Sequence, residues 1–186
     1  MNRHCAGCHR ENGAAFSLTG YGEARPWAKA IRDEVLSRRM PPWAPVKGVG
    51  EFKGDASLSL PEIDMLVAWV EGGAPEGDPQ LLPKPVPLLA RSGAVPFRRT
   101  VEVASTLTLS SPATVRGLRA SGLGAHQSME AWATAPDGTV ERLISLRDFN
   151  KIAARDYALR VPLRLPAGTK IRVSAPPGAS LNLLCN

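Results

Sequence analysis

The sequence is poor in the residues from which catalytic and metal centres are usually built. It contains only three His and three Cys, and aromatic residues make up 5% of the chain. No apolar run reaches the roughly 18 residues of a membrane-spanning helix. Lys and Arg occur singly or in pairs, not in basic tracts. These absences predict no membrane span and argue against a nucleic-acid-binding face, where clustered basic residues with aromatic neighbours are typical.

The rest of the composition is that of a globular protein. Hydrophobic residues make up 44% of the 186 positions, which is enough for a packed core. The 17 Gly and 17 Pro predict many turns. The formal charge of +6 is dispersed along the chain, so we interpret it as a solvated basic surface.

Two of the three Cys stand together near the start of the sequence, in Cys5-Ala6-Gly7-Cys8-His9. Two thiols separated by two residues can add to the two vinyl groups of one haem, and the imidazole that follows then lies beneath the iron. A redox disulfide usually has a βαβ context, and a zinc site needs further soft ligands nearby. The remaining Cys and His are Cys185, His4 and His126. The motif therefore predicts one covalent haem c on Cys5 and Cys8, with His9 as an axial iron ligand.

A methionine is expected as the second axial ligand. Met40 lies in Arg39-Met40-Pro41-Pro42-Trp43, directly after a predicted helix, where the prolines hold the chain extended. A thioether presented from such a rigid loop would favour ferrous iron and raise its potential. Met65 fits core filling in an amphipathic helix, and His4 is too near the attachment site to reach the other face of the haem. We therefore predict Met40.

Two helices are predicted around these residues. The first runs from about Ala24 or Pro26 to Arg39. Its apolar stripe consists of Trp27, Ile31, Val35 and Leu36. The second begins near Ser59, a plausible cap, and runs to about Glu71, where Gly72-Gly73 ends it.

Residues 5 to about 80 resemble the single-haem cytochrome c domain of a group of exported bacterial proteins. Besides the haem motif, the resemblance rests on residues 24–29, 39–43 and 68–78. It implies a class I cytochrome c fold with His9 and Met40 as axial ligands, in the periplasm or otherwise exported. Such domains normally have a helix before the haem motif, and only four residues precede Cys5 here. We expect a mature or trimmed form, or a chain whose true start lies upstream. The leading helix is then missing, or another chain covers its place.

The composition changes at about Pro75. Prolines punctuate residues 75–96, which is typical of a semi-rigid linker. We predict a haem domain at 1–78, a Pro-rich linker at 79–96 and a second domain at 97–186.

The second domain has the period-two pattern of β-strands. The clearest case is 157–165, whose odd-numbered positions are apolar and whose Pro162 indicates an edge or a bulge. Further strands are predicted at 99–109, 113–119, 128–134, 139–146 and 171–175, with a turn at Pro136-Asp137-Gly138. The predicted fold is an α + β two-domain chain, in which a small all-α domain precedes an antiparallel, jelly-roll-like β-sandwich.

This half is similar to a β-sandwich domain often fused to that haem domain, one half of the copper type II, ascorbate-dependent monooxygenase fold. The matching stretches are 114–119, 128–131, 135–138, 148–150 and 164–171. In copper-binding relatives a His-x-His pair follows the strand that ends here near Arg119, and alternate strand positions place both imidazoles on one face. His126 is the only histidine among residues 119–127, so the His-x-His pair is absent. Copper is therefore not expected.

Other reactive residues have ordinary interpretations. His126 is interpreted as an exposed or hydrogen-bonded loop residue and Met129 as part of the core. Cys185 is buried, bridged to another chain or free. No Ser/His/Asp or Cys/His catalytic set can be assembled once one His binds iron.

The ligand inventory favours an electron carrier over an enzyme. Two strong axial ligands leave no open position on the iron for a substrate, and the β-sandwich would then serve docking to a redox partner or assembly into a larger complex. The alternative is a haem-containing subunit of a copper-dependent monooxygenase-like enzyme, whose copper ligands another subunit would have to supply. A haem sensor would require a labile Met40.

Overall fold

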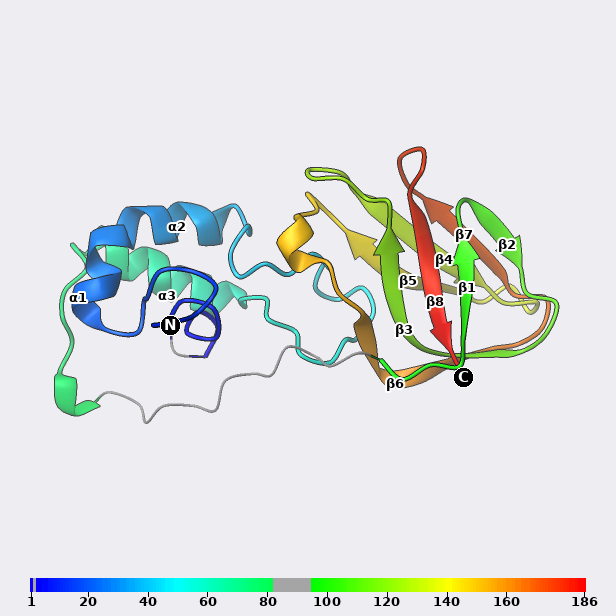
Figure 1. Ribbon diagram of the computed structural model, residues 1–186, viewed down its shortest axis with the longest axis horizontal. Coiled ribbons are helices and arrows are strands. Elements are labelled where there is room, and N and C mark those ends of the chain that lie inside the picture. Colours follow the sequence, from blue (N-terminus) through cyan, green and yellow to red (C-terminus); the bar gives the residue numbers. More distant parts are fainter. Residues whose placement is uncertain (2, 82–94) are drawn as a thin grey trace. The chain divides into compact units, whose positions relative to one another are not determined.

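The computed structural model describes residues 1, 3–81 and 95–186, which form two compact units (Figure 1). The helical unit comprises Met1–Trp43 and Ala56–Arg91, and the β unit comprises Ala44–Asp55 and Ser92–Asn186. The chain is mostly β with some α structure. The predicted succession of helices and then antiparallel strands is confirmed. None of the described helices is long and apolar enough to cross a bilayer.

The helical unit has short helices joined by turns. They are α1 (Tyr21–Ala24), η1 (Arg25–Trp27), α2 (Ala28–Leu36), α3 (Leu60–Glu71) and η2 (Pro79–Leu81). Pro26 lies in the first turn of η1, where the missing N–H has no partner to lose. The first predicted helix is confirmed in place, but it is divided between η1 and α2 and ends at Leu36 instead of Arg39. It ends early because Arg38 adopts a left-handed conformation, with φ of 56°.

Helix α3 begins and ends where it was predicted. Ser59 and Glu62 form a capping box, in which the Ser59 N–H donates to the Glu62 carboxylate at 2.8 Å. Gly72 caps the other end, and Gly73 follows with φ of 87°. The capping box fixes the first residue of α3.

The inward face of α3 contributes to a small apolar core. Ile63 packs with the buried Val35 and Leu58, and partly buried Ile31, Leu66 and Val67 surround them. The prediction that Met65 fills the core is wrong, because its side chain is 71% exposed. Ile63, Leu66 and Val67 lie at helical spacing on the buried face, and Met65 falls outside that stripe.

The β unit contains two antiparallel sheets of four strands each (Figure 1). The first has the order β1-β8-β3-β6 and the second the order β2-β7-β4-β5. The first sheet consists of β1 (Arg99–Val103), β8 (Ser180–Cys185), β3 (Ala113–Ser121) and β6 (Tyr157–Leu165). The second consists of β2 (Thr106–Thr108), β7 (Lys170–Ser174), β4 (Met129–Thr134) and β5 (Val140–Leu146). The result is a β-sandwich-like fold.

Two details of the strands differ from the sequence prediction. The segment 99–109 was predicted as one strand, but β1 and β2 pair in different sheets and residues 104–105 separate them. The last strand, β8, was not predicted, although Leu181, Leu183 and Cys185 alternate with the period of a strand. The turn at residues 136–138 is confirmed between β4 and β5.

Alternate side chains of the strands form the core of this unit. Each is at most 1% exposed: Val115, Leu118, Met129, Ile144, Leu146, Ile171, Leu181 and Leu183. Burying one such side chain contributes about 1.5–3 kcal/mol. The prediction that Met129 belongs to the core is confirmed.

Strand β6 lies at an edge of the first sheet, as Pro162 predicts. It also bulges, because Val115 of β3 pairs with Leu163 whereas Gly117 pairs with Ala158. Pro162 lies between Ala158 and Leu163, where the strand pairing shifts register. Both predictions for this proline are confirmed.

A segment from the first half of the sequence covers this edge. Phe52 forms a bridge with Leu159 of β6, and the Arg160 N–H donates to the Glu51 carbonyl at 2.8 Å. The Phe52 side chain is buried and meets the Tyr157 ring edge-on, with 5.8 Å between centroids. Backbone groups of β6 that would otherwise face solvent are therefore paired within the chain.

The same segment also reaches the edge of the second sheet. Pro45 forms a bridge with Leu146 of β5, and the Val46 N–H donates to the Ser145 carbonyl at 2.8 Å. Residues 44–55 thus belong with the β unit, although the sequence-based boundaries place them in the domain 1–78. Of the predicted linker at 79–96, residues 82–94 lie outside the described residues.

The turn after β3 provides a test of this packing. Gly122 has φ of 68°, and a Cβ built there would lie 2.2 Å from the Gly178 carbonyl oxygen. Gly138 has φ of 87°, but its Cβ would meet nothing within 4 Å. We expect Gly138→Ala to lower the free energy of unfolding by about 1 kcal/mol through backbone strain alone, and Gly122→Ala to lower it by at least twice as much. Urea unfolding followed by circular dichroism checks this, and equal losses would contradict the packing described.

Candidate functional site

The Cys5–His9 motif forms a single tight turn. The His9 N–H donates to the Cys5 carbonyl at 2.9 Å, and the Cys8 N–H donates to the same oxygen at 3.1 Å. Positions four apart on such a turn lie one above the other, so the turn presents Cys5, Cys8 and His9 as one group. Both Cys are free and half-buried. The structure therefore brings together three of the four predicted site residues.

Burial raises the pKa of the Cys5 thiol above the usual 9.0, because the thiolate is poorly solvated there.

The imidazole of His9 is oriented by one hydrogen bond. Its Nδ1 lies 2.9 Å from the carbonyl oxygen of Phe16, and a carbonyl can only accept. Nδ1 therefore carries the proton, a tautomer assigned from this contact, and Nε2 keeps its lone pair. Iron-ligating and other metal-ligating imidazoles are commonly oriented in this way, through a hydrogen bond from the second nitrogen.

Aromatic side chains lie next to this imidazole. The Phe16 ring meets His9 edge-on at 4.9 Å and stacks on Trp27 at 4.5 Å. Phe16 is 49% exposed and Trp27 is 47% exposed, so a substantial apolar surface beside His9 faces outward. Trp27 was predicted in the apolar stripe of a helix, whereas the structure stacks its half-exposed ring on Phe16. Phe16 was not identified as a site residue from the sequence.

These residues fit a covalent haem. Haem c needs two thiols, an imidazole nitrogen with a free lone pair and apolar side chains against the porphyrin ring. The turn at residues 5–9 provides the first two, and Phe16 with Trp27 provides apolar surface next to them. Among the described residues, no three or more His, Cys, Asp and Glu gather as a metal-binding group.

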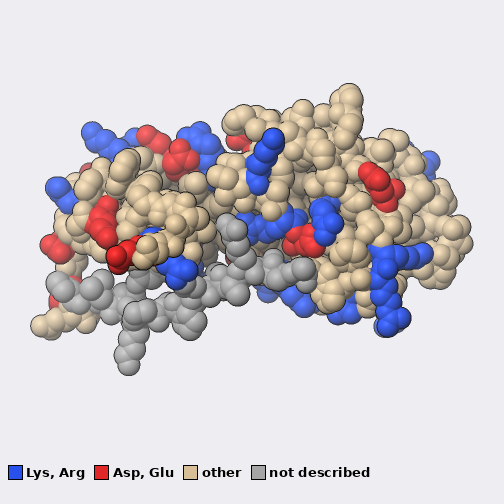
Figure 2. Space-filling model, in the orientation of Figure 1, with Lys and Arg blue, Asp and Glu red and all other residues tan. Residues whose placement is uncertain are grey.

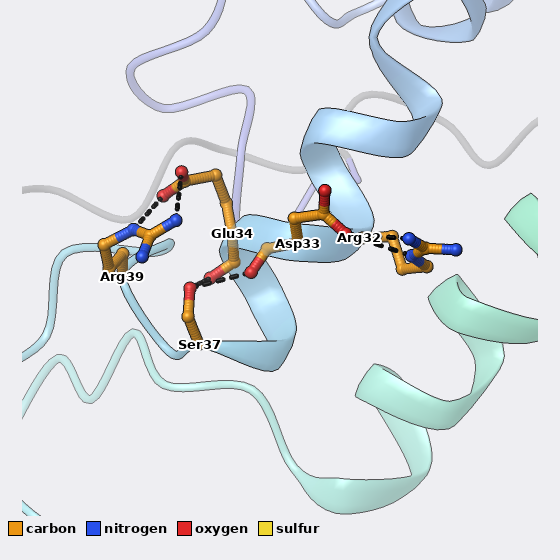
Figure 3. A network of polar contacts seen from close by, with 5 residues as sticks. All are labelled: Arg32, Asp33, Glu34, Ser37 and Arg39. Carbon is orange, nitrogen blue, oxygen red and sulfur yellow. Dashed lines mark hydrogen bonds and ion pairs between the residues drawn. The ribbon is translucent and has the colours of Figure 1, made fainter.

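Met40 lies in the same unit as the haem motif, after α2. The Met40 N–H donates to the Glu34 carbonyl at 3.2 Å, and the side chain is half-buried. Arg39, its neighbour, forms an ion pair with Glu34 (Figure 3). The predicted ligand is thus held on a structured turn at the end of a helix. Glu34 was not recognised from the sequence, because helical side chains pair at spacings of three or four residues. The pair with Arg39 forms because α2 ends at Leu36 and the chain turns at Arg38.

His4 has a structural role next to the motif. Its Nε2 lies 3.1 Å from the Glu62 carboxylate and its Nδ1 lies 3.2 Å from the Ala56 carbonyl. These contacts connect the N-terminal turn to the start of α3. His4 therefore forms hydrogen bonds within its own unit through both ring nitrogens.

The reactive residues of the β unit do not form a site. His126 is 80% exposed, and its Nδ1 lies 2.7 Å from a carboxylate oxygen of Asp148. It is thus the exposed, hydrogen-bonded loop histidine that was predicted. Cys185 is fully buried in β8, which decides among the alternatives for this thiol, and burial raises its pKa.

Charged side chains are spread over the molecule. Figure 2 shows Lys and Arg in several groups on one face, with Asp and Glu among them. In the β unit Arg119 pairs with Asp156, and its Nη2 donates to the Asp156 carboxylate at 2.8 Å. Arg119 also lies over the Phe97 ring, 5.6 Å from its centroid. These contacts join β3 to the start of β6 and are structural.

No known protein family matches this chain, and searches of curated proteins and of solved structures found no relative. Function must therefore be argued from the site itself.

The capping box of Ser59 and Glu62 at the start of α3 predicts a pH dependence of stability. Hydrogen bonds from Ser59, with a smaller contribution from His4, lower the pKa of Glu62 from 4.5 to about 2. A carboxylate whose pKa falls on folding stabilises the folded state above its unfolded pKa, and this contribution is lost as pH falls toward the folded pKa. We expect Glu62→Gln to be less stable than wild type at pH 7, with a gap that closes between pH 4.5 and about 2. Denaturant unfolding across this range measures the gap, and a constant gap would contradict the assignment.

Proposed function

We propose that the chain is an exported c-type cytochrome that transfers electrons through one haem attached to Cys5 and Cys8. The observation that carries this proposal is the hydrogen bond between His9 Nδ1 and the Phe16 carbonyl, at 2.9 Å. It leaves Nε2 free to bind iron, on the same turn that presents both thiols. A redox disulfide has no need of the imidazole, and a zinc site requires a fourth ligand beside Cys5, Cys8 and His9.

The surroundings of His9 support a role for the helical unit as a class I cytochrome c domain. A bound haem supplies a one-electron ferric/ferrous couple. Phe16 and Trp27 offer the apolar surface that keeps water away from the imidazole. Met40 is proposed as the second axial ligand, and its thioether favours the ferrous state. With both axial positions filled by the protein, no substrate reaches the iron, and electron transfer is the chemistry left.

We assign the β unit a role in docking to a redox partner or in assembly. This is supported by its well-packed core and by the solitary imidazole of His126, which is too few ligands for copper catalysis. Stoichiometric copper bound to the purified full-length protein would contradict this assignment. It would favour a copper-dependent monooxygenase-like enzyme in which the haem supplies electrons.

The covalent attachment has a direct test. After expression with a c-type maturation system, we expect the intact mass to exceed that of the chain by one haem, and acid extraction to leave the haem on the protein. The double variant Cys5→Ala/Cys8→Ala should lose the covalent haem entirely. The matched control is Cys185→Ala, which removes the third Cys, buried in β8, and should keep the haem. A wild-type protein without covalent haem would contradict the proposal.

The second ligand is tested by two methionine variants of the same unit. Ferric wild type should show the weak long-wavelength absorption band of iron–methionine coordination, and the ferrous form should not bind carbon monoxide. We expect Met40→Ala to lose the band, to bind carbon monoxide and to have a lower reduction potential, because the thioether is gone. Met65→Ala removes a methionine that is 71% exposed on α3 and should leave all three properties unchanged. Loss of the band in Met65→Ala alone would overturn the assignment.

A further inference from the structure

The chain leaves α2 through a backbone motif that ends at Met40. The Arg39 N–H donates to the Glu34 carbonyl at 3.0 Å, and the Arg38 N–H donates to the Val35 carbonyl at 3.1 Å. This pair of bonds is a Schellman motif, with Arg38 at the left-handed position. The Met40 N–H shares the Glu34 carbonyl, at 3.2 Å. The Glu34 carbonyl therefore accepts hydrogen bonds from the backbone N–H groups of both Arg39 and Met40.

The Glu34 side chain reinforces the same two residues. Its carboxylate accepts from Arg39 Nε at 3.0 Å and from Arg39 Nη2 at 2.8 Å, a fork-shaped ion pair (Figure 3). Glycine usually occupies the left-handed position of such a motif, because it has no Cβ, whereas here the position is filled by Arg38. The turn thus forms despite an unfavourable residue, and the ion pair of Glu34 with Arg39 spans it from one side to the other.

We propose that Glu34 is the positioning residue for the Met40 thioether. The inference rests on the proposed function, in which Met40 binds the iron. A neutral thioether binds a metal weakly, so the backbone that presents it must hold it in place. A more mobile Arg39–Met40 segment therefore increases the fraction of protein in which the Met40 sulfur has dissociated from the iron. Exposed ion pairs of this kind shift an equilibrium about two- to fivefold, and Glu34 and Arg39 side chains are 37% and 47% exposed.

The same helix carries a matched control. Asp33 accepts from Arg32 Nε at 3.1 Å and from Nη2 at 3.0 Å, also in a fork-shaped pair (Figure 3). The Asp33 side chain touches neither Arg39 nor Met40 among the contacts that the described residues show, and its carbonyl bonds to Ser37 survive substitution of the side chain. Asp33→Asn therefore removes an equivalent charge and ion pair without loosening the Met40 segment.

The experiment is an imidazole titration of the purified ferric holoprotein. Imidazole binds iron only where Met40 has left, so its apparent affinity reports the displaced fraction. We expect Glu34→Gln to bind imidazole about two- to fivefold more tightly than wild type, with a weaker long-wavelength band, and Asp33→Asn to match wild type. Met40→Ala sets the upper limit of the affinity.

A second variant separates positioning from simple electrostatics. Arg39→Gln breaks the same ion pair by removing a positive charge, whereas Glu34→Gln removes a negative one. Positioning predicts that both variants bind imidazole more tightly, and that the double variant adds little to either. A field effect on the iron would instead move the reduction potential of the two variants in opposite directions with unchanged imidazole affinity, which would overturn the proposal.

The failure of this inference is distinguishable from failure of the proposed function. If the wild type carries no covalent haem, the proposed function falls. If the haem is present but Met40→Ala binds imidazole no better than wild type, Met40 is not the ligand, and the role of Glu34 falls with that assignment. If Met40→Ala binds it far more tightly while Glu34→Gln and Arg39→Gln equal Asp33→Asn, only the role of Glu34 is overturned.

Discussion

The hydrogen bonds of Ala44–Asp55 to β5 and β6 are the constraint on which the arrangement of the chain depends. A sandwich of two open sheets leaves strand edges that invite pairing with other chains. Here Val46 and Glu51 satisfy backbone groups at an edge of each sheet, and Phe52 is buried against Tyr157. The segment that does this lies between α2 and α3. The helical unit is therefore built from two separate stretches, and the β unit is incomplete without residues from the first half of the sequence.

Local signals predicted most of the elements, and non-local pairing explains where they failed. Ser59 and Gly72 mark the ends of α3 because caps act within one turn, and Pro162 marks an edge because it lacks an N–H. The division of 99–109 into β1 and β2 depends on partners some 70 residues away, in β8 and β7. No periodicity within the segment encodes that. The attachment of 44–55 to the β unit is equally non-local, since prolines and glycines there indicate only turns.

The residues of the candidate site also divide into those that local sequence predicts and those that it does not. Cys5, Cys8 and His9 are predictable because five adjacent residues determine their own geometry in one turn. The Phe16 carbonyl that orients His9 is a backbone group, and any residue at position 16 would carry it, so the sequence holds no sign of it. Glu34 is intermediate, because its side chain pairs with Arg39 locally but its importance appears only when its carbonyl is seen to hold Met40. Met65 misled because an apolar residue in an amphipathic helix is usually buried, and the buried stripe of α3 passes beside it.

The segment that carries Met40 is restrained by backbone hydrogen bonds on both sides. On the N-terminal side, Met40 follows the turn fixed by Glu34, and on the C-terminal side only five residues separate it from Val46, which is bonded to β5. A segment restrained at both ends keeps fewer conformations, so less entropy is lost when its thioether binds a metal. With Met40 as the iron ligand, as proposed, the turn held by Glu34 lowers the entropy that this segment loses when its thioether binds.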